Sequence, residues 1–243
     1  MVAYERFATF YDVVMDDPAP RAARVDDAIA RFRPDAGSLL ELGCGTGSIL
    51  ARLTADVELT GLDRSPSMLA IAARKVPGAH LVEGDMARFD LGRRFDVVAS
   101  VFDSVNHLTT VAAWESLLAC VHRHLVDDGL FVFDVNTVGE LRRLGDEPPW
   151  VSDFEGGTAV VDVSAAGSDE GITVSEWDIR IFECVAGARY ELHHERIGEI
   201  ALPLSEVRRL VVDGFELLEE VDEDGVAASD DSVKAYYALR RRE

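Results

Sequence analysis

The sequence is organised around a short apolar segment that ends in closely spaced glycines. Residues 39–42 read Leu-Leu-Glu-Leu, and residues 43–47 read Gly-Cys-Gly-Thr-Gly. The apolar run predicts a buried strand, and glycine is needed where a backbone turns sharply or approaches a ligand closely. The following stretch, 46–54, is expected to be a helix whose first N–H groups face a polar ligand. The segment therefore predicts a nucleotide-type site at the end of a strand.

The spacing of these glycines differs from that of dinucleotide-binding loops. Those loops usually read G-x-G-x-x-G, with an acidic residue about 20 positions later. This chain reads G-x-G-x-G, with Glu41 just before the glycines and Asp63 at the end of the next apolar run. A nicotinamide-dependent oxidoreductase is therefore an alternative interpretation, but the missing G-x-x-G half and a third acid, Asp85, argue against it.

Strands and helices are expected to alternate along most of the chain. The expected strands are 38–42, 57–62, 79–83, 95–101, 130–135, 215–221 and 233–240, and the helices after the loop are 65–75, 110–125 and 204–213. Such alternation predicts an α/β fold, a doubly wound parallel sheet with right-handed crossovers.

The alternation is interrupted between the fifth and sixth expected strands. Residues 158–165, 172–185 and 188–197 are strand-like and have only turns between them. This pattern predicts an inserted antiparallel meander of three strands. We expect an insertion over 150–198 that covers a substrate pocket, between core segments 36–149 and 199–243.

Composition restricts the partners of the chain. The net charge is −21 over 243 residues, and a field of that sign repels the phosphates of nucleic acid. Nucleic acid is therefore not expected as a partner. A membrane is not expected either, because no apolar run approaches the roughly 20 residues that a membrane span needs. The amino terminus lacks a long apolar signal core and the three cysteines are scattered, which together predict a cytoplasmic protein.

Three motifs resemble those of one family, the class I S-adenosylmethionine-dependent methyltransferases. The similar stretches are 41–47 (Glu-Leu-Gly-Cys-Gly-Thr-Gly), 61–65 (Gly-Leu-Asp-Arg-Ser) and 83–86 (Glu-Gly-Asp-Met), each at the end of an expected strand. The resemblance implies a Rossmann-like sheet of seven mostly parallel strands with the last strand antiparallel. It also implies S-adenosylmethionine as the cofactor.

The resemblance assigns cofactor-binding roles to particular residues. Gly43 and Gly45 would admit the methionine and ribose portions, and Glu41 would lie near the methionine amino group. Asp63 would accept hydrogen bonds from the ribose hydroxyls, since a carboxylate offers two acceptor oxygens. Asp85 would accept from the adenine amino group. The remaining implied contacts are Arg64, Met68, Met86, Val101 and Phe102.

The substrate side rests on fewer residues. Segment 103–108 is similar to that of bacterial small-molecule methyltransferases, including enzymes that dimethylate nucleotide-linked amino sugars, and His107 is either a general base or a residue that packs beneath the next helix. The aromatic leading segment 1–35 is either a helical lid, with Tyr11 facing the site, or an amphipathic helix packed on the domain. Its Tyr-x-x-Phe-Ala-x-x-Tyr-Asp pattern is similar to that of other bacterial methyltransferases.

No metal site is expected, although His193 and His194 lie close to acidic residues. Their spacing does not match known metal-binding motifs, and a solvated sheet face is the preferred interpretation. The sequence thus predicts transfer of a methyl group to a nitrogen or oxygen of a small molecule by in-line displacement. A cofactor-binding subunit without catalysis is the remaining alternative, and a homodimer is left open.

Overall fold

The main sheet of the computed structural model has seven strands, in the order β10-β11-β5-β4-β1-β2-β3. The structure describes residues 4, 6–15, 17–168, 171–187 and 189–242. The strands are β1 (Ser38–Leu42), β2 (Glu58–Asp63), β3 (His80–Glu83), β4 (Phe95–Ser100), β5 (Leu125–Asn136), β10 (Phe215–Val221) and β11 (Lys234–Arg241). Strand β11 is antiparallel to β5 and β10, whereas β1 to β5 pair in parallel. The expected seven-stranded sheet with an antiparallel last strand is confirmed.

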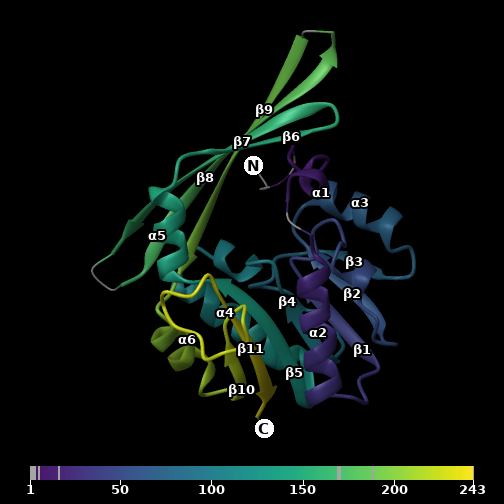
Figure 1. The fold of residues 1–243 in the computed structure, drawn as a ribbon. Helices are drawn as coiled ribbons and strands as arrows, with labels where there is room; N and C mark the ends of the chain where they lie inside the picture. The colour runs from purple at the N-terminus through teal and green to yellow at the C-terminus, as the bar shows by residue number, and fades with distance from the viewer. Residues whose placement is uncertain (1–3, 5, 16, 169–170, 188, 243) are drawn as a thin grey trace.

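Helices cover both faces of this sheet (Figure 1). On one face α2 (Ala19–Phe32) and α3 (Pro66–Lys75) share a hydrophobic core with Leu39 and Val97. On the other face α4 (Val111–His124) and α6 (Leu204–Val211) pack in a core with Leu40 and Val98. Neighbouring residues of one strand thus enter opposite cores, because side chains alternate across a strand. Both faces being covered explains why these strands are almost uniformly apolar.

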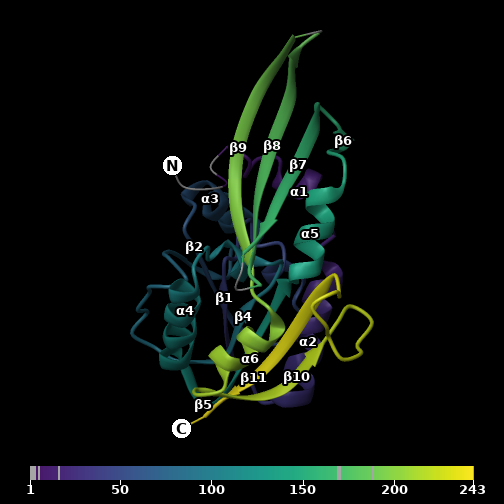
Figure 2. The same cartoon turned by 90° about the vertical axis from the view of Figure 1, so that its left-hand side faces the viewer.

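A second sheet rises from the carboxyl edge of the first (Figures 1 and 2). It contains four antiparallel strands, β6 (Trp150–Phe154), β7 (Gly157–Gly167), β8 (Thr173–Ala186) and β9 (Arg189–Ala201). The prediction of three strands was wrong by one. The additional strand is β6, which follows Pro148-Pro149 and pairs with β7 from Trp150 onward. The far end of the β8–β9 hairpin extends well beyond the body of the molecule.

One expectation about helices was wrong, and one helix was not predicted. Residues 46–54 do not form a helix; only Leu50–Arg52 form a short 3-10 turn, η1. Gly47 has a left-handed φ of +73° and a Cβ there would lie 3.2 Å from Ala72, so the backbone departs from helical geometry. Conversely, Val138–Asp146 form helix α5, which was not predicted. Its Thr137 cap accepts a hydrogen bond from the Glu140 backbone N–H at 3.1 Å, which offsets the poor helix propensity of two glycines.

The leading segment is less helical than its aromatic spacing suggests. Helix α1 covers only Tyr11–Val14, and the described residues before it form turns. The Glu195 carboxylate on β9 accepts hydrogen bonds from the backbone N–H groups of Tyr4 and Phe7, at 2.8 and 3.2 Å. Phe7 and Phe10 are buried in a core formed with the second sheet. The segment is therefore held between the second sheet and the glycine loop.

Candidate active site

The glycine loop closes tightly against the segment that follows β4. Gly43 and Gly45 have φ values of +68° and +51°, which side-chain-bearing residues rarely adopt. A Cβ at Gly43 would lie 2.9 Å from the Ser104 side chain and 3.1 Å from the Met86 methyl group. Glycine is therefore required at 43 both by backbone conformation and by the close approach of two neighbouring side chains.

Asp63 is oriented by this loop. Its Oδ2 accepts a hydrogen bond from the Gly45 N–H and its Oδ1 from the Ser65 N–H, both at 2.8 Å. Burial raises the pKa of Asp63, and the hydrogen bonds from Ser65 and Gly45 act in the opposite direction. Each oxygen keeps a further lone pair, so the carboxylate can accept from two hydroxyl groups without losing its support.

Two adjoining cavities surround the glycine loop. The larger, of about 590 Å³, is within the size range of small-molecule sites. It is lined by many of the residues predicted from the sequence: Tyr11, Gly43, Gly45, Asp63, Arg64, Met68, Asp85, Met86, Phe102 and His107. The smaller cavity, of about 230 Å³, shares Tyr11, Gly43, Gly45 and Phe102 and adds Glu41 and Val101. The structure thus brings every predicted site residue to one region, and their individual roles stay predictions.

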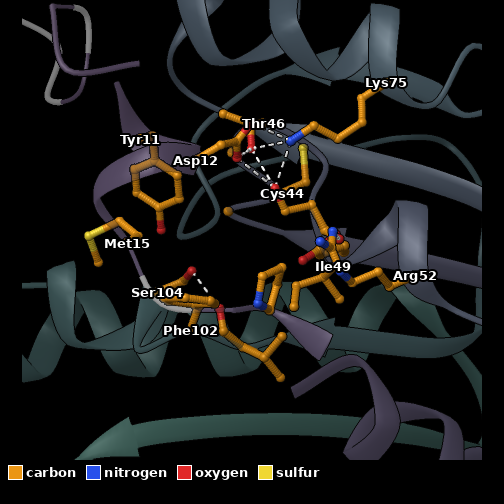
Figure 3. A pocket seen from close by; sticks show the side chains of 16 residues that line it. Tyr11, Asp12, Met15, Cys44, Thr46, Ile49, Arg52, Lys75, Phe102 and Ser104 are labelled. Carbon is orange, nitrogen blue, oxygen red and sulfur yellow. Dashed lines mark hydrogen bonds and ion pairs between the residues drawn. The ribbon is translucent and has the colours of Figure 1, made fainter. Parts of the chain in front are cut away.

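A polar cluster joins the leading segment to the glycine loop at the smaller cavity (Figure 3). The Asp12 carboxylate accepts hydrogen bonds from Thr46 Oγ1 at 2.6 Å and Ser48 Oγ at 2.8 Å. The Lys75 ammonium of α3 donates to the same carboxylate at 2.6 Å. We call these four residues, Asp12, Thr46, Ser48 and Lys75, the clasp. The clasp holds the short helix α1 against the loop, and the sequence analysis did not identify it.

Glu41 supplies a test of whether the site fits a cationic cofactor. Its side chain is buried in β1, and its Oε2 has no hydrogen-bond partner among the described residues. Burial, and then the charge of Asp63, raise the pKa of Glu41. A buried acceptor without a partner is costly, and an ammonium group in the adjoining cavity would both satisfy it and favour its charged form. The buried Glu41 carboxylate therefore fits the amino group at the methionine end of S-adenosylmethionine.

The segment after β4 has an unusual backbone. Phe102 and Asp103 both have left-handed φ values, +68° and +52°. The buried Asp134 carboxylate at the end of β5 accepts hydrogen bonds from the N–H groups of both residues, at 3.1 and 2.6 Å. Asp134 thereby fixes the turn that presents Phe102 to both cavities. In the sequence, Asp134 is an acid near the end of the fifth expected strand, and this position was not recognised as part of the site.

His107 lies on the short 3-10 helix η2 (Ser104–His107) and lines the larger cavity. Its Nε2 is 3.0 Å from the Tyr4 hydroxyl, and its Nδ1 is buried without a hydrogen-bond partner among the described residues. Glu199 Oε1, on β9, lies 3.8 Å from Nδ1. Burial lowers the pKa of His107, so the ring is neutral at neutral pH and able to accept a proton.

A buried ionic network lies behind His107. The Lys234 ammonium on β11 donates to Asp103 Oδ1 at 2.5 Å and to Asn136 Oδ1 at 2.7 Å. The Asn136 side chain in turn donates to Glu199 Oε2 at 3.3 Å. Burial, and then Asp103, raise the pKa of Glu199 to about 8. Long-range pairing assembles this network, and the only local signal was an acid, Glu199, within the apolar run 197–201.

The two histidines of the second sheet pair with acids individually. His193 Nε2 lies 2.8 Å from Glu183, and His194 Nε2 lies 2.9 Å from Asp178. Within the described ranges, no three His, Cys, Asp or Glu side chains come together as a metal site.

Among all the residues that the structure describes, no helix combines the length and apolarity needed to cross a bilayer.

Comparisons with known proteins agree on one family. The profile described as a methyltransferase domain matches residues 39–129. The dTDP-3-amino-3,6-dideoxy-alpha-D-glucopyranose N,N-dimethyltransferase of Streptomyces fradiae is 35% identical over 201 residues, which are 80% of this chain and 77% of that protein.

Solved structures extend the similarity to the whole fold. The S-adenosylmethionine-bound amino pentose methyltransferase CalS10 of Micromonospora echinaspora is 26% identical, with a TM-score of 0.76 over 99% of this chain and 98% of that one. A methyltransferase from Clostridium acetobutylicum, 19% identical, has a TM-score of 0.84 with full coverage of both chains and supports the fold alone. The chain therefore belongs to the class I S-adenosylmethionine-dependent methyltransferases, and among its relatives are enzymes that methylate amino sugars.

Proposed function

We propose that this enzyme transfers a methyl group to the amino nitrogen of a small, sugar-like acceptor by in-line displacement. The observation that carries the proposal is the larger cavity. One wall holds Asp63 and Asp85 at the ends of neighbouring strands, and another holds His107 and the edge of β9. A proton acceptor thus lines the same cavity as the residues that suit the cofactor.

The cofactor side of the cavity supplies position and charge. S-adenosylmethionine, when bound, supplies an electrophilic methyl group and a good leaving group, so the protein needs to orient and enclose the reactants. Asp63 would hold the ribose, Asp85 and Met86 the adenine, and Glu41 the amino group. The glycine loop allows the backbone to approach the ligand without interference from a Cβ.

The acceptor side must remove a proton. An amine is mostly protonated at neutral pH, and only its unprotonated form has the lone pair that attacks carbon. His107 is suited to accept this proton because burial keeps its ring neutral. Tyr4 and Tyr11, both partly buried aromatic residues that line the cavity, would exclude water and orient the acceptor, which makes the leading segment a lid.

The relatives favour nitrogen over oxygen as the acceptor atom. The Streptomyces fradiae enzyme is named for dimethylation of an amino sugar linked to dTDP, and CalS10 is described as an amino pentose methyltransferase. The ionised Asp103 carboxylate near His107 also suits a cationic amine better than a neutral hydroxyl. A nucleotide-linked acceptor would need cations for its phosphates, and Arg64 and Arg196 line the same cavity.

A matched set of acceptors tests the proposal. The enzyme is incubated with S-adenosylmethionine and a dTDP-linked amino sugar, its N-acetyl derivative, or the corresponding sugar with a hydroxyl in place of the amine. We expect mass spectrometry to find methylation of the amine alone, because acetylation removes the nucleophilic lone pair. Equal methylation of the hydroxyl sugar would contradict the assignment of nitrogen.

A variant tests the role of His107. His107→Ala should lower turnover by about 10²-fold with little change in cofactor affinity, which is the usual effect of losing a general base. Unchanged turnover at saturating acceptor would show that the cavity only positions the reactants.

A further inference from the structure

Glu199 and His107 meet where the second sheet joins the main fold. The Glu199 side chain is only 3% exposed and its Oε1 lies 3.8 Å from His107 Nδ1. That nitrogen is buried and has no hydrogen bond of ordinary geometry among the described residues, and the backbone carbonyl of Gly198, the residue before Glu199, also acts on the ring and raises its pKa. The other ring nitrogen, Nε2, contacts the Tyr4 hydroxyl on the cavity side. The two ring nitrogens therefore face different environments: Nδ1 faces the Glu199 carboxyl group, and Nε2 faces the cavity.

The position of Glu199 is fixed independently of His107. Its Oε2 accepts from the Asn136 amide at 3.3 Å, and Asn136 accepts in turn from Lys234 at 2.7 Å. Strand β9 pairs with β8 through Ser175 opposite Glu199, which sets the direction of the side chain. A carboxyl group held this firmly can orient a neighbouring ring.

We propose that Glu199 is a positioning residue for His107: its carboxylate accepts a hydrogen bond from the Nδ1–H group and so keeps Nε2 as the basic nitrogen facing the cavity. The proposal rests on the proposed function only for its kinetic consequence. A decrease of the Nδ1···Oε1 distance by less than 1 Å gives an ordinary hydrogen bond, and rotation of the ring can supply it. Glu199 has no assigned role in the sequence motifs of the site.

The proton lost by the acceptor amine is transferred to the His107 ring in this arrangement. The N–H bond of the acceptor ammonium breaks, its electron pair stays on nitrogen, and the proton reaches Nε2 directly or by exchange through the Tyr4 hydroxyl. His107 then carries a positive charge that faces the Glu199 carboxylate. An ion pair in a low-dielectric environment stabilises this charged state far more than solvent-screened charges would.

The protonation state of the pair follows from all the groups around it. Besides each other, His107 and Glu199 face these charged or titratable groups: Tyr4 of the leading segment, Arg64 after β2, Asp103 after β4 and Lys234 of β11. Burial and Asp103 raise the pKa of Glu199 to about 8. The active form, with a Glu199 carboxylate and a proton on Nδ1, is therefore reached by loss of one shared proton near pH 8.

The variant Glu199→Gln separates this role from simple packing. Glutamine has the same shape and can keep the contact with Asn136, but it cannot take a proton or a negative charge. The wild-type pair keeps its shared proton up to about pH 8, whereas the variant leaves only the His107 ring, whose pKa is lowered by burial. The last proton should therefore leave the variant at a lower pH than it leaves the wild type. The ascending limb of kcat/KM against pH should move to lower pH, with turnover about tenfold lower.

Nuclear magnetic resonance of His107 in the full-length enzyme is the decisive measurement. With ¹⁵N-labelled histidine, the wild type at pH 9 should have its proton on Nδ1, and Glu199→Gln should titrate at lower pH. Glu191→Gln, an exposed acid on the same strand, is the matched control and should titrate like the wild type. A wild-type proton on Nε2 at pH 9, or identical titrations in wild type and Glu199→Gln, would overturn the proposal.

These readouts need no acceptor. If the ring titration changes as expected but no amine is methylated, the proposed acceptor is wrong and the positioning role stands. If amines are methylated with an unchanged ring titration, the positioning role fails alone. Failure of Glu199→Gln to fold would leave the wild-type proton position as the test.

Discussion

The buried ion pair between Lys234 and Asp103 predicts how the site depends on one cation. The Lys234 ammonium lies near three carboxyl groups, those of Asp103, Asp134 and Glu199, and the Lys234 side chain is 10% exposed. The substitution Lys234→Met keeps most of the side-chain length but removes the charge and the donor. It leaves Asp103 Oδ1 without its donor at 2.5 Å and the Asn136 side-chain oxygen, Oδ1, without its donor at 2.7 Å.

The expected loss of stability is large. Breaking a buried pair by removing one partner costs about 3–5 kcal/mol, because the other charge stays buried without compensation. For a chain of this size, about 1 kcal/mol corresponds to roughly 2–4 °C in Tm. Lys234→Met should therefore lower Tm by about 6–20 °C, and Lys234→Met with Asp103→Asn should lose less than the sum of the two single variants.

The pH dependence has a definite sign. Although burial raises the pKa of Asp103, the Lys234 ammonium lowers it below its ordinary value. A lowered folded-state pKa stabilises the protein above the unfolded value of about 3.9, and this stabilisation is lost as the pH falls through the folded value. Thermal unfolding of the wild type and Lys234→Met should therefore converge below about pH 4. A loss of less than about 1 kcal/mol at pH 7 would refute the argument that these carboxyl groups depend on Lys234.

Three further outcomes follow from the site. Gly43→Ala should weaken S-adenosylmethionine binding at least tenfold in calorimetry and cost about 1–3 kcal/mol of stability, because its Cβ would lie 2.9 Å from Ser104; unchanged affinity would mean that the loop can move away. Asp12→Ala should open the clasp and weaken cofactor binding about fivefold, a modest effect because Asp12 is partly exposed, and equal dissociation rates in stopped flow would argue against a lid. Glu199→Gln should flatten the fall in Tm between about pH 4.3 and pH 8, because the raised pKa of Glu199 makes the wild-type protein less stable as pH rises through that window.

The central sheet could be predicted because its signals are local. Each of β1, β2 and β4 is a short apolar run, and alternation with helices leaves few arrangements. The acids at strand ends, Asp63 and Asp85, could be placed in one cavity for the same reason: the carboxyl ends of parallel strands meet at one edge. Such predictions depend on neighbours in sequence and on the handedness of the chain.

The rest of the site depends on contacts between distant segments. Thr46, Gly47 and Ser48 follow an apolar strand and are typical of a helix start. Asp12 and Lys75, however, bind the side chains of Thr46 and Ser48, and Gly47 has a left-handed φ of +73°, so the loop is not helical. The aromatic residues before Tyr11 have helical spacing. The backbone N–H groups of Tyr4 and Phe7, however, donate hydrogen bonds to Glu195 on β9 of the second sheet. No local pattern distinguishes these outcomes from a helix.

The electrostatic character of the cavity links the composition of the chain to its chemistry. Glu41, Asp63 and Asp85 line the cavities on the proposed cofactor side, and Asp103 and Glu199 lie behind the proposed acceptor side. The ionised members of this set favour a cationic sulfonium and a cationic amine, while Arg64 and Arg196 in the same cavity supply the cations that a nucleotide-linked acceptor needs against the net charge of −21. Methyl transfer removes the positive charge from the cofactor sulfur, so the acids that attract the cofactor attract its product less. The same acids therefore serve selection before the reaction and release after it, while Lys234 limits how much unbalanced negative charge the folded protein must bury.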